Sequence, residues 1–196
     1  MARTRASDFD TKQRAILTHA AGVFAGMGME KASMAQIAER SNISKALLYH
    51  YYPSKDALVF GIIQAHLIEL DAAVTAADDK DAKPAERLQA LIRTVLLSYR
   101  NADSHHKVQL NGTASLTPDQ QSEIRAIERR IVARFADILR LINPDLERTM
   151  LKPMTMSLFG ILNWVYLWFH EDGPISRRDY ADAVTALFLG GVKAVA

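Results

Sequence analysis

Residues 33–55 read Ser33-Met-Ala-Gln-Ile-Ala-Glu-Arg-Ser-Asn-Ile-Ser-Lys-Ala-Leu-Leu-Tyr-His-Tyr-Tyr-Pro-Ser-Lys55, and this stretch decides the fold of the N-terminal part. Apolar residues recur at helical spacing on both sides of Ser41-Asn42, which predicts two short helices joined by a tight turn. Asn42 tolerates the left-handed backbone of such a turn, and Ser44 can cap the second helix. This is the pattern of a helix-turn-helix unit, whose second helix can lie in the major groove of DNA.

The second helix of the pair is expected to expose groups that can contact DNA. One of Leu47 and Leu48 should point inward, and Pro53 ends the helix because the residue before a proline avoids the α conformation. Tyr52 is expected to fill an apolar site rather than to contact DNA. The outward face would then carry Lys45, Ala46, Tyr49 and His50.

Composition predicts an ordinary globular protein. Of the 196 residues, 49% are hydrophobic and 23% are charged. The chain has no cysteine, which excludes disulfides and thiolate metal sites. The most apolar window, taken to be residues 158–169, is too short to span a bilayer. We therefore expect a cytoplasmic protein without a membrane partner.

Charge is distributed unevenly along the chain. Residues 1–60 hold eight Lys or Arg against five Asp or Glu, whereas the remaining residues hold 16 against 17. A basic N-terminal part and a nearly neutral remainder are typical of a DNA-binding domain attached to a different module.

The periodicity predicts an all-α chain of about nine helices. An N-terminal three-helix helix-turn-helix domain is expected over residues 1–56, and a helical ligand-binding and dimerisation domain over 57–196. Residues 105–116 hold one short helix at most, and Pro153 is expected to interrupt a helix. Ser176 and Asp179 resemble a capping box. The remaining predicted helices cover 11–27, 33–40, 44–52, 54–77, 85–102, 117–141, 154–170 and 180–195.

The last two predicted helices are more apolar than a small monomer can easily cover, so they indicate a dimer interface. Two copies packing through these helices would form a four-helix bundle. The alternative is that the same helices form the core of the monomer. The residues expected at the interface are Leu162, Val165, Phe169, Val184, Leu187, Phe188 and Gly191.

Residues 11–58 resemble the DNA-binding domain of TetR-family transcriptional regulators. The matching positions are Phe24 and Gly28, Ser33 with Ile37-Ala38, Asn42-Ile43, Ser44-Lys45, Leu48 through Tyr52, and Ser54-Lys55 with Leu58. The resemblance implies a homodimer with a divergent ligand-binding domain. Such a protein is usually a repressor that a small molecule releases from a palindromic operator.

The resemblance and the side-chain chemistry together suggest roles in DNA binding. Lys45, Ala46 and Leu47 would meet base edges, although the family often has Gly-Thr at the last two positions. His50 faces either a phosphate or solvent. The full set expected to contact phosphates is Ser33, Tyr49, His50, Tyr51 and Lys55.

The effector site is predicted only from aromatic and polar residues in the middle and late helices. Its candidates are Tyr99, Arg100, Asn111, Asn163 and Tyr166, and the alternative is that these residues belong to the core or to a solvated surface. Arg93 and Arg100 lie seven residues apart and could meet an anion such as an acyl-coenzyme A, which several regulators of this family sense. An ordinary solvated face is the alternative. His105-His106 lacks the spacing of a helical metal pair, so neither a metal nor another cofactor is expected.

Two other classes of protein remain as alternatives. A helical adaptor would use the apolar C-terminal helices to bind another protein. A small all-α enzyme is less favoured, because the chain has no nucleophile elbow, phosphate-binding glycine loop or His-Glu-x-x-His motif. Asp78, Asp79 and Asp81 are expected to solubilise a loop rather than to catalyse a reaction.

Overall fold

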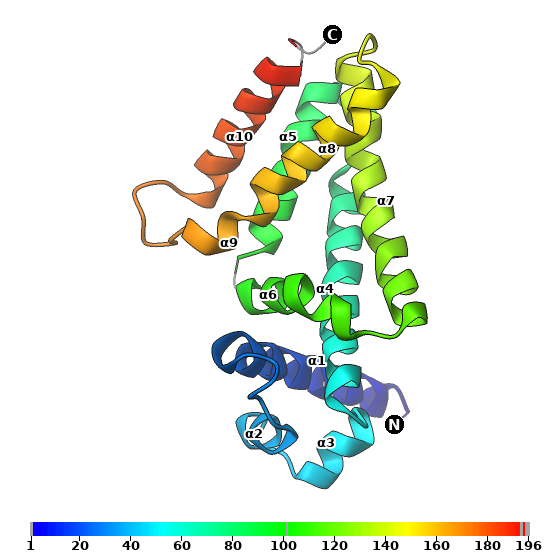
Figure 1. Cartoon of the computed structure of the whole chain (residues 1–196), viewed down its shortest axis with the longest axis vertical. Helices are drawn as coiled ribbons and strands as arrows, with labels where there is room; N and C mark the ends of the chain where they lie inside the picture. Colours follow the sequence, from blue (N-terminus) through cyan, green and yellow to red (C-terminus); the bar gives the residue numbers. More distant parts are fainter. Residues whose placement is uncertain (1, 101, 193, 195–196) are drawn as a thin grey trace. The chain divides into compact units, whose positions relative to one another are not determined.

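The structure is a computed structural model that describes residues 2–100, 102–192 and 194. The described residues form ten α-helices and one short 3-10 helix without any strand, which confirms the all-α prediction (Figure 1). The elements are α1 (Ala2–Met27), α2 (Met34–Arg40), α3 (Lys45–Tyr51), α4 (Lys55–Ala77), α5 (Pro84–Ser98), α6 (Asp103–Gly112), η1 (Thr113–Ser115), α7 (Pro118–Ile142), α8 (Arg148–Asn163), α9 (Val165–Trp168) and α10 (Arg177–Val192).

The chain divides into two compact units. The N-terminal unit comprises residues up to 67 together with 102–124, so it includes α6 as well as the first three helices. The C-terminal unit comprises residues 68–100 and those from 125 onward. The long helices α4 and α7 contribute to both units. A functional division after residue 56 stays a prediction.

In the N-terminal unit, α1 packs against α2 and α6. It buries one apolar face through Ile16, Ala20 and Phe24, which recur every four residues. Gly28 follows the helix with a φ of 83°, and its N–H donates to the carbonyl oxygen of Phe24 at 3.0 Å. Glycine adopts this left-handed conformation without a steric cost, so it ends α1 cleanly.

The turn between α2 and α3 is fixed by backbone hydrogen bonds around Asn42. This residue has a φ of 53°. Its N–H donates to Glu39 O and that of Ile43 donates to Ala38 O, both at 3.0 Å, which is the Schellman pattern of a helix end. The Ser44 hydroxyl then accepts from the N–H of Leu47 at 3.1 Å and caps α3. The predicted tight turn is present, and its sequence signals are the residues that form it.

Helix α4 is a core helix of the fold. Among the described residues it alone is long and apolar enough to cross a membrane by length and composition, although the most apolar window was expected at 158–169. Leu58, Ile62 and Ile63 are fully buried in the protein, and 44% of its most apolar window is buried. Core helices of soluble proteins can be equally long and apolar, so these two properties are weak support for a membrane span.

In the C-terminal unit, α5 packs against α10 and α8. Leu88, Ile92 and Val95 are fully buried at helical spacing on α5. The rings of Phe135 on α7 and Phe159 on α8 meet edge to face, with centroids 5.0 Å apart. These contacts form the core of the unit.

Asp78 has a structural role that the sequence did not indicate. It lies after α4 with its side chain buried. It accepts a hydrogen bond from Arg87 Nε at 2.9 Å and forms an ion pair with Lys80. Burial alone would raise the pKa of Asp78, but the hydrogen bonds from Arg87 and Lys80 outweigh it, so the pKa is lowered. The expectation that Asp78 merely solubilises a loop is therefore wrong.

Two predicted features of the last helices also need correction. Pro153 lies inside α8 and does not interrupt it; a proline there removes one backbone hydrogen bond near the start of the helix. The break comes instead at Trp164, after which α9 lasts only four residues. The capping box before α10 is confirmed, because Ser176 Oγ donates to Asp179 Oδ2 at 2.7 Å and accepts from Asp179 N at 3.1 Å.

Candidate functional site

Helix α3 exposes almost its whole surface and is held by one side chain. Leu48 is completely buried, whereas Leu47 is 38% exposed and Tyr49 is 49% exposed. Lys45, Ala46 and His50 are also exposed. The inward leucine is therefore Leu48, and Leu47 belongs to the outward face.

Tyr51 and Tyr52 come directly after the exposed residues of α3 and are progressively more buried. Tyr51 is half-buried, and its ring meets that of His50 edge to face at a centroid distance of 6.0 Å. Tyr52 is buried beside Gly61, where a Cβ would lie 3.0 Å from its ring. Tyr52 thus fills an apolar site, as expected, and burial raises the pKa of its phenol.

Two of the expected phosphate contacts also hold the fold. Ser33 lies exposed at the start of α2, where its hydroxyl donates to Gln36 Oε1 at 2.9 Å and accepts from Gln36 N at 3.3 Å. Lys55 is half-buried, and its ammonium donates to the carbonyl oxygens of Glu30 and Ala32, both at 3.3 Å. An ammonium has three N–H donors, so one of them is left for a phosphate.

Two of the effector candidates are joined in the C-terminal unit. Tyr99 at the end of α5 is 4% exposed, and its hydroxyl donates to Asn163 Oδ1 on α8 at 3.0 Å. Burial, with a smaller contribution from Glu128, raises the pKa of Tyr99, so its phenol stays protonated and acts as a donor. Tyr166 is half-buried and stacks on Trp164 at 6.2 Å.

The other effector candidates are placed elsewhere. Arg100 is exposed, with Nε 3.5 Å from Glu171 Oε2. Arg93 donates to both carboxylate oxygens of Asp182, at 2.7 and 2.8 Å, so this pair cross-links α5 and α10. Asn111 belongs to the N-terminal unit, where its amide donates to Lys107 O at 2.8 Å and it helps to line a cavity of about 170 Å³.

The N-terminal unit contains a cluster of three histidines that was not predicted from the sequence. His66 on α4 lies 6.0 Å from His105 and 6.3 Å from His106 on α6, measured between ring centroids. Burial, aided by the two neighbouring imidazoles, lowers the pKa of His66 to about 3. The sequence held a signal for this placement, because His66 continues the buried stripe of Ile62 at a spacing of four residues.

The expected dimer residues fall into two groups. Leu162, Val165, Val184 and Phe188 are buried within the protomer, so their side chains cover its own core. This corrects the expectation that they meet a partner. Periodicity could not separate the two faces because both are apolar. Of the remaining three, Leu187 and Gly191 are exposed and Phe169 is half-buried beneath the guanidinium of Arg177.

Helices α8 and α10 also carry apolar or small residues on their exposed faces. On α10, Ala183, Leu187 and Gly191 lie four residues apart on the outer face. On α8, Met156 is 48% exposed and a Cβ added at Gly160 would meet open space. Trp164, which directly follows α8, is 56% exposed. The two helices therefore each present an uncovered apolar stripe in addition to their buried one.

Two family models match this chain, one in its N-terminal part and one in its C-terminal part. Residues 16–62 match the model of the bacterial regulatory proteins of the tetR family, and residues 81–192 match a tetracyclin repressor-like C-terminal domain. The first match spans α2 and α3 and the second spans α5 through α10. Regulators of this family bind DNA and form dimers.

Individual relatives agree with these matches. A TetR-family transcriptional regulator from Bordetella parapertussis is 30% identical, with a TM-score of 0.85, over 94% of this chain and 97% of that one. The protein AibR, whose structure was solved in complex with isovaleryl coenzyme A and operator DNA, is 28% identical, with a TM-score of 0.79, over 90% of this chain and 97% of that one. The repressor KstR2 of Mycobacterium tuberculosis is 24% identical over 95% of this chain and 96% of its own. The chain belongs to the TetR family of transcriptional regulators.

Proposed function

We propose that this protein is a homodimeric repressor that inserts α3 into the major groove of a palindromic operator. The observation that carries the proposal is the exposure of α3, in which Leu48 anchors the helix while Lys45, Ala46 and Leu47 face outward. In this arrangement the three outward residues meet base edges. Ser33, Tyr49, His50, Tyr51 and Lys55 contact phosphates around them.

DNA binding is tested by fluorescence anisotropy with fragments from upstream of the gene and its neighbours. We expect saturable, salt-sensitive binding to a fragment that contains an inverted repeat. Lys45→Gln should weaken this binding, whereas Lys152→Gln, at an exposed position on α8, serves as the charge-matched control. Loss of salt-sensitive binding in both variants, or its absence in the unchanged protein, would contradict the proposal.

The proposed dimer uses the uncovered stripes of α8 and α10. The small residues Ala183 and Gly191 allow two helices to approach closely on either side of Leu187, which is 67% exposed. Leu187→Glu is expected to give a folded monomer in sedimentation velocity. Leu141→Glu is the matched control, since Leu141 is an exposed leucine on α7 and the variant should stay dimeric. Equal behaviour of the two variants would contradict this interface.

For the effector we propose an apolar or anionic metabolite of the acyl-coenzyme A class, bound in the C-terminal unit. Support comes from the AibR structure with isovaleryl coenzyme A, and from the hydrogen bond that joins the buried Tyr99 to the half-buried Asn163. A ligand that binds only the folded state raises its melting temperature. We expect isovaleryl coenzyme A to raise it and to release DNA, and Tyr99→Phe to reduce both effects. Coenzyme A alone is the control ligand.

The competing adaptor function draws on the exposed side chains of Trp164, Leu167 and Trp168. It is separated from the first proposal by the same anisotropy experiment, because an adaptor shows no salt-sensitive DNA binding. We propose no catalytic role for this protein. As a transcriptional regulator, it would act in the cytoplasm.

A further inference from the structure

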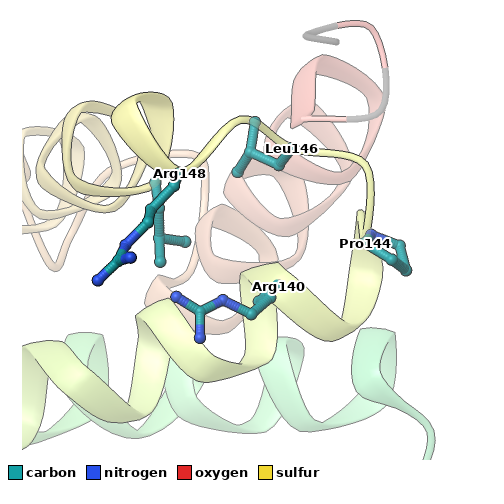
Figure 2. Close-up of a pocket in the computed structure, with 5 residues that line it drawn as sticks. Arg140, Pro144, Leu146 and Arg148 are labelled. Atoms are coloured by element: carbon teal, nitrogen blue, oxygen red, sulfur yellow. The ribbon is translucent and has the colours of Figure 1, made fainter.

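We propose that the turn between α7 and α8 binds the phosphate group of a phosphomonoester. A cavity of about 320 Å³ lies at this turn within the C-terminal unit. Its volume lies within the range of small-molecule sites, roughly 300–1,000 Å³. The lining residues are Arg140, Pro144, Leu146, Arg148 and Leu151 (Figure 2).

The charges of the two arginines point to an anion. Figure 2 shows that the side chains of Arg140 on α7 and Arg148 on α8 extend over the same cavity. Neither guanidinium forms an ion pair with a carboxylate within the part of the chain that the structure describes. Two like charges that face one space repel each other, and an anion between them replaces repulsion by attraction. The planar donor fork of arginine matches the oxygens of a phosphate.

Arg148 is the more informative of the two residues. Arg140 lies in the last turn of α7, where the helix dipole favours a cation and thus accounts for it. Arg148 is the first residue of α8, where the dipole disfavours a cation. The first turn of α8 has no acidic residue, and Glu147 gives no side-chain cap. Helix stability therefore does not account for Arg148, whereas a bound anion does.

The wall of the cavity indicates an ester rather than free phosphate. Pro144, Leu146 and Leu151 are the apolar residues that line the cavity together with the two arginines. A carbon skeleton attached to the phosphate would remove this surface from water and add to the affinity.

The position of the cavity connects it to α10. Asn143 precedes Pro144 in the turn, and its amide donates to the carbonyl oxygen of Val192 on α10 at 2.9 Å. The N–H of Asp145 donates to Asn143 Oδ1 at 3.2 Å and closes the turn. A ligand held by Arg140 and Arg148 would therefore stabilise the junction of α7, α8 and α10. Any consequence for dimerisation rests on the function proposed above, but ligand binding itself does not.

The test is isothermal titration of phenyl phosphate into the full-length protein without DNA. We expect saturable binding that is tighter than that of inorganic phosphate, and no binding of phenol. Arg140→Gln and Arg148→Gln should each weaken binding about tenfold or more, since a hydrogen bond to a charged group contributes about 1.5–3 kcal/mol. Arg129→Gln is the control, because it removes an exposed charge from α7 outside the cavity.

Thermal unfolding separates loss of the site from loss of the fold. Arg148→Gln should leave the melting temperature of the free protein unchanged or raised, because it removes a cation from a helix N-terminus. Three results would overturn the proposal: no saturable binding, equal weakening by Arg129→Gln, or equal affinity for phenyl phosphate and inorganic phosphate. None of them bears on DNA binding, which is measured separately.

Discussion

Helices α3 and α10 both place a leucine on the surface, but they are held in opposite ways. Helix α3 has seven residues and one buried side chain, Leu48, so its position depends on the turn at Asn42 and the cap at Ser44. Helix α10 has 16 residues and buries a full stripe that includes Val184 and Phe188. A short helix that offers nearly all its surface to a partner must be fixed at its ends, whereas a long one can be fixed along its length.

The sharpest way to test this difference is to compare the adjacent leucines of α3. Leu48→Ala should lower the free energy of unfolding by roughly 2–5 kcal/mol, because it leaves a cavity at the only buried side chain of the helix. Leu47→Ala should change it by about 0.5 kcal/mol or less, since this side chain is exposed. Urea denaturation measures both. Similar losses in the two variants would mean that α3 is anchored by its whole surface.

Acidification should weaken the N-terminal unit through its histidine cluster. The pKa of His66 is lowered to about 3 in the folded protein, against about 6.5 in the unfolded chain. The unfolded state therefore binds the proton first, and stability is lost as the pH falls from about 6.5 toward about 3. We expect a loss of about 2 kcal/mol between about pH 7 and about pH 5.

The source of this pH dependence is tested by unfolding His66→Leu across the same range. This variant should show a shallower slope of stability against pH than the unchanged protein. His170→Leu is a control, because that histidine is exposed. An unaltered slope in His66→Leu would remove His66 as the source.

The turn at Asn42 offers a smaller test of how the ends of α3 are fixed. Asn42→Val should lower the free energy of unfolding by about 1–2 kcal/mol, because a β-branched residue is strained at a φ of 53°. Asn42→Gly should preserve stability to within about 0.5 kcal/mol, since glycine adopts this conformation freely. Thermal unfolding of the pair distinguishes the two, and equal stability of the variants would show that the turn does not constrain α3.

The smallest expected effect concerns Lys55. Lys55→Ala should weaken binding to all DNA sequences and reduce the slope of log affinity against log salt by about 0.9, the value for one phosphate contact. Since Lys55 also donates to Glu30 O and Ala32 O, Lys55→Arg is included to keep the charge. An unchanged slope in Lys55→Ala would assign Lys55 to the loop alone.

The accuracy of the sequence predictions follows the same division between local and distant contacts. The tight turn and the caps at Ser44 and Ser176 depend on neighbours within a few residues, and the structure has them as expected. Tyr52 is also buried as expected, although it packs beside Gly61 on the next helix. The prediction that four residues, now found buried in the protomer, face a partner could not be made correctly from the sequence, because two apolar faces of one helix look alike in sequence. The prediction for Asp78 was wrong because its partner, Arg87, lies on the next helix.

The sequence by itself determined the class of the fold, the position of the helix-turn-helix unit and the chemistry of its exposed face. Helical periodicity, capping residues and a left-handed turn are written in short stretches of chain, so they can be read without coordinates. Only the tertiary structure decided which leucine of α3 is buried, which stripe of α10 is left uncovered, and that His66 meets two histidines of α6. These outcomes depend on packing between segments far apart in the chain, because burial of a side chain is set by what lies against it.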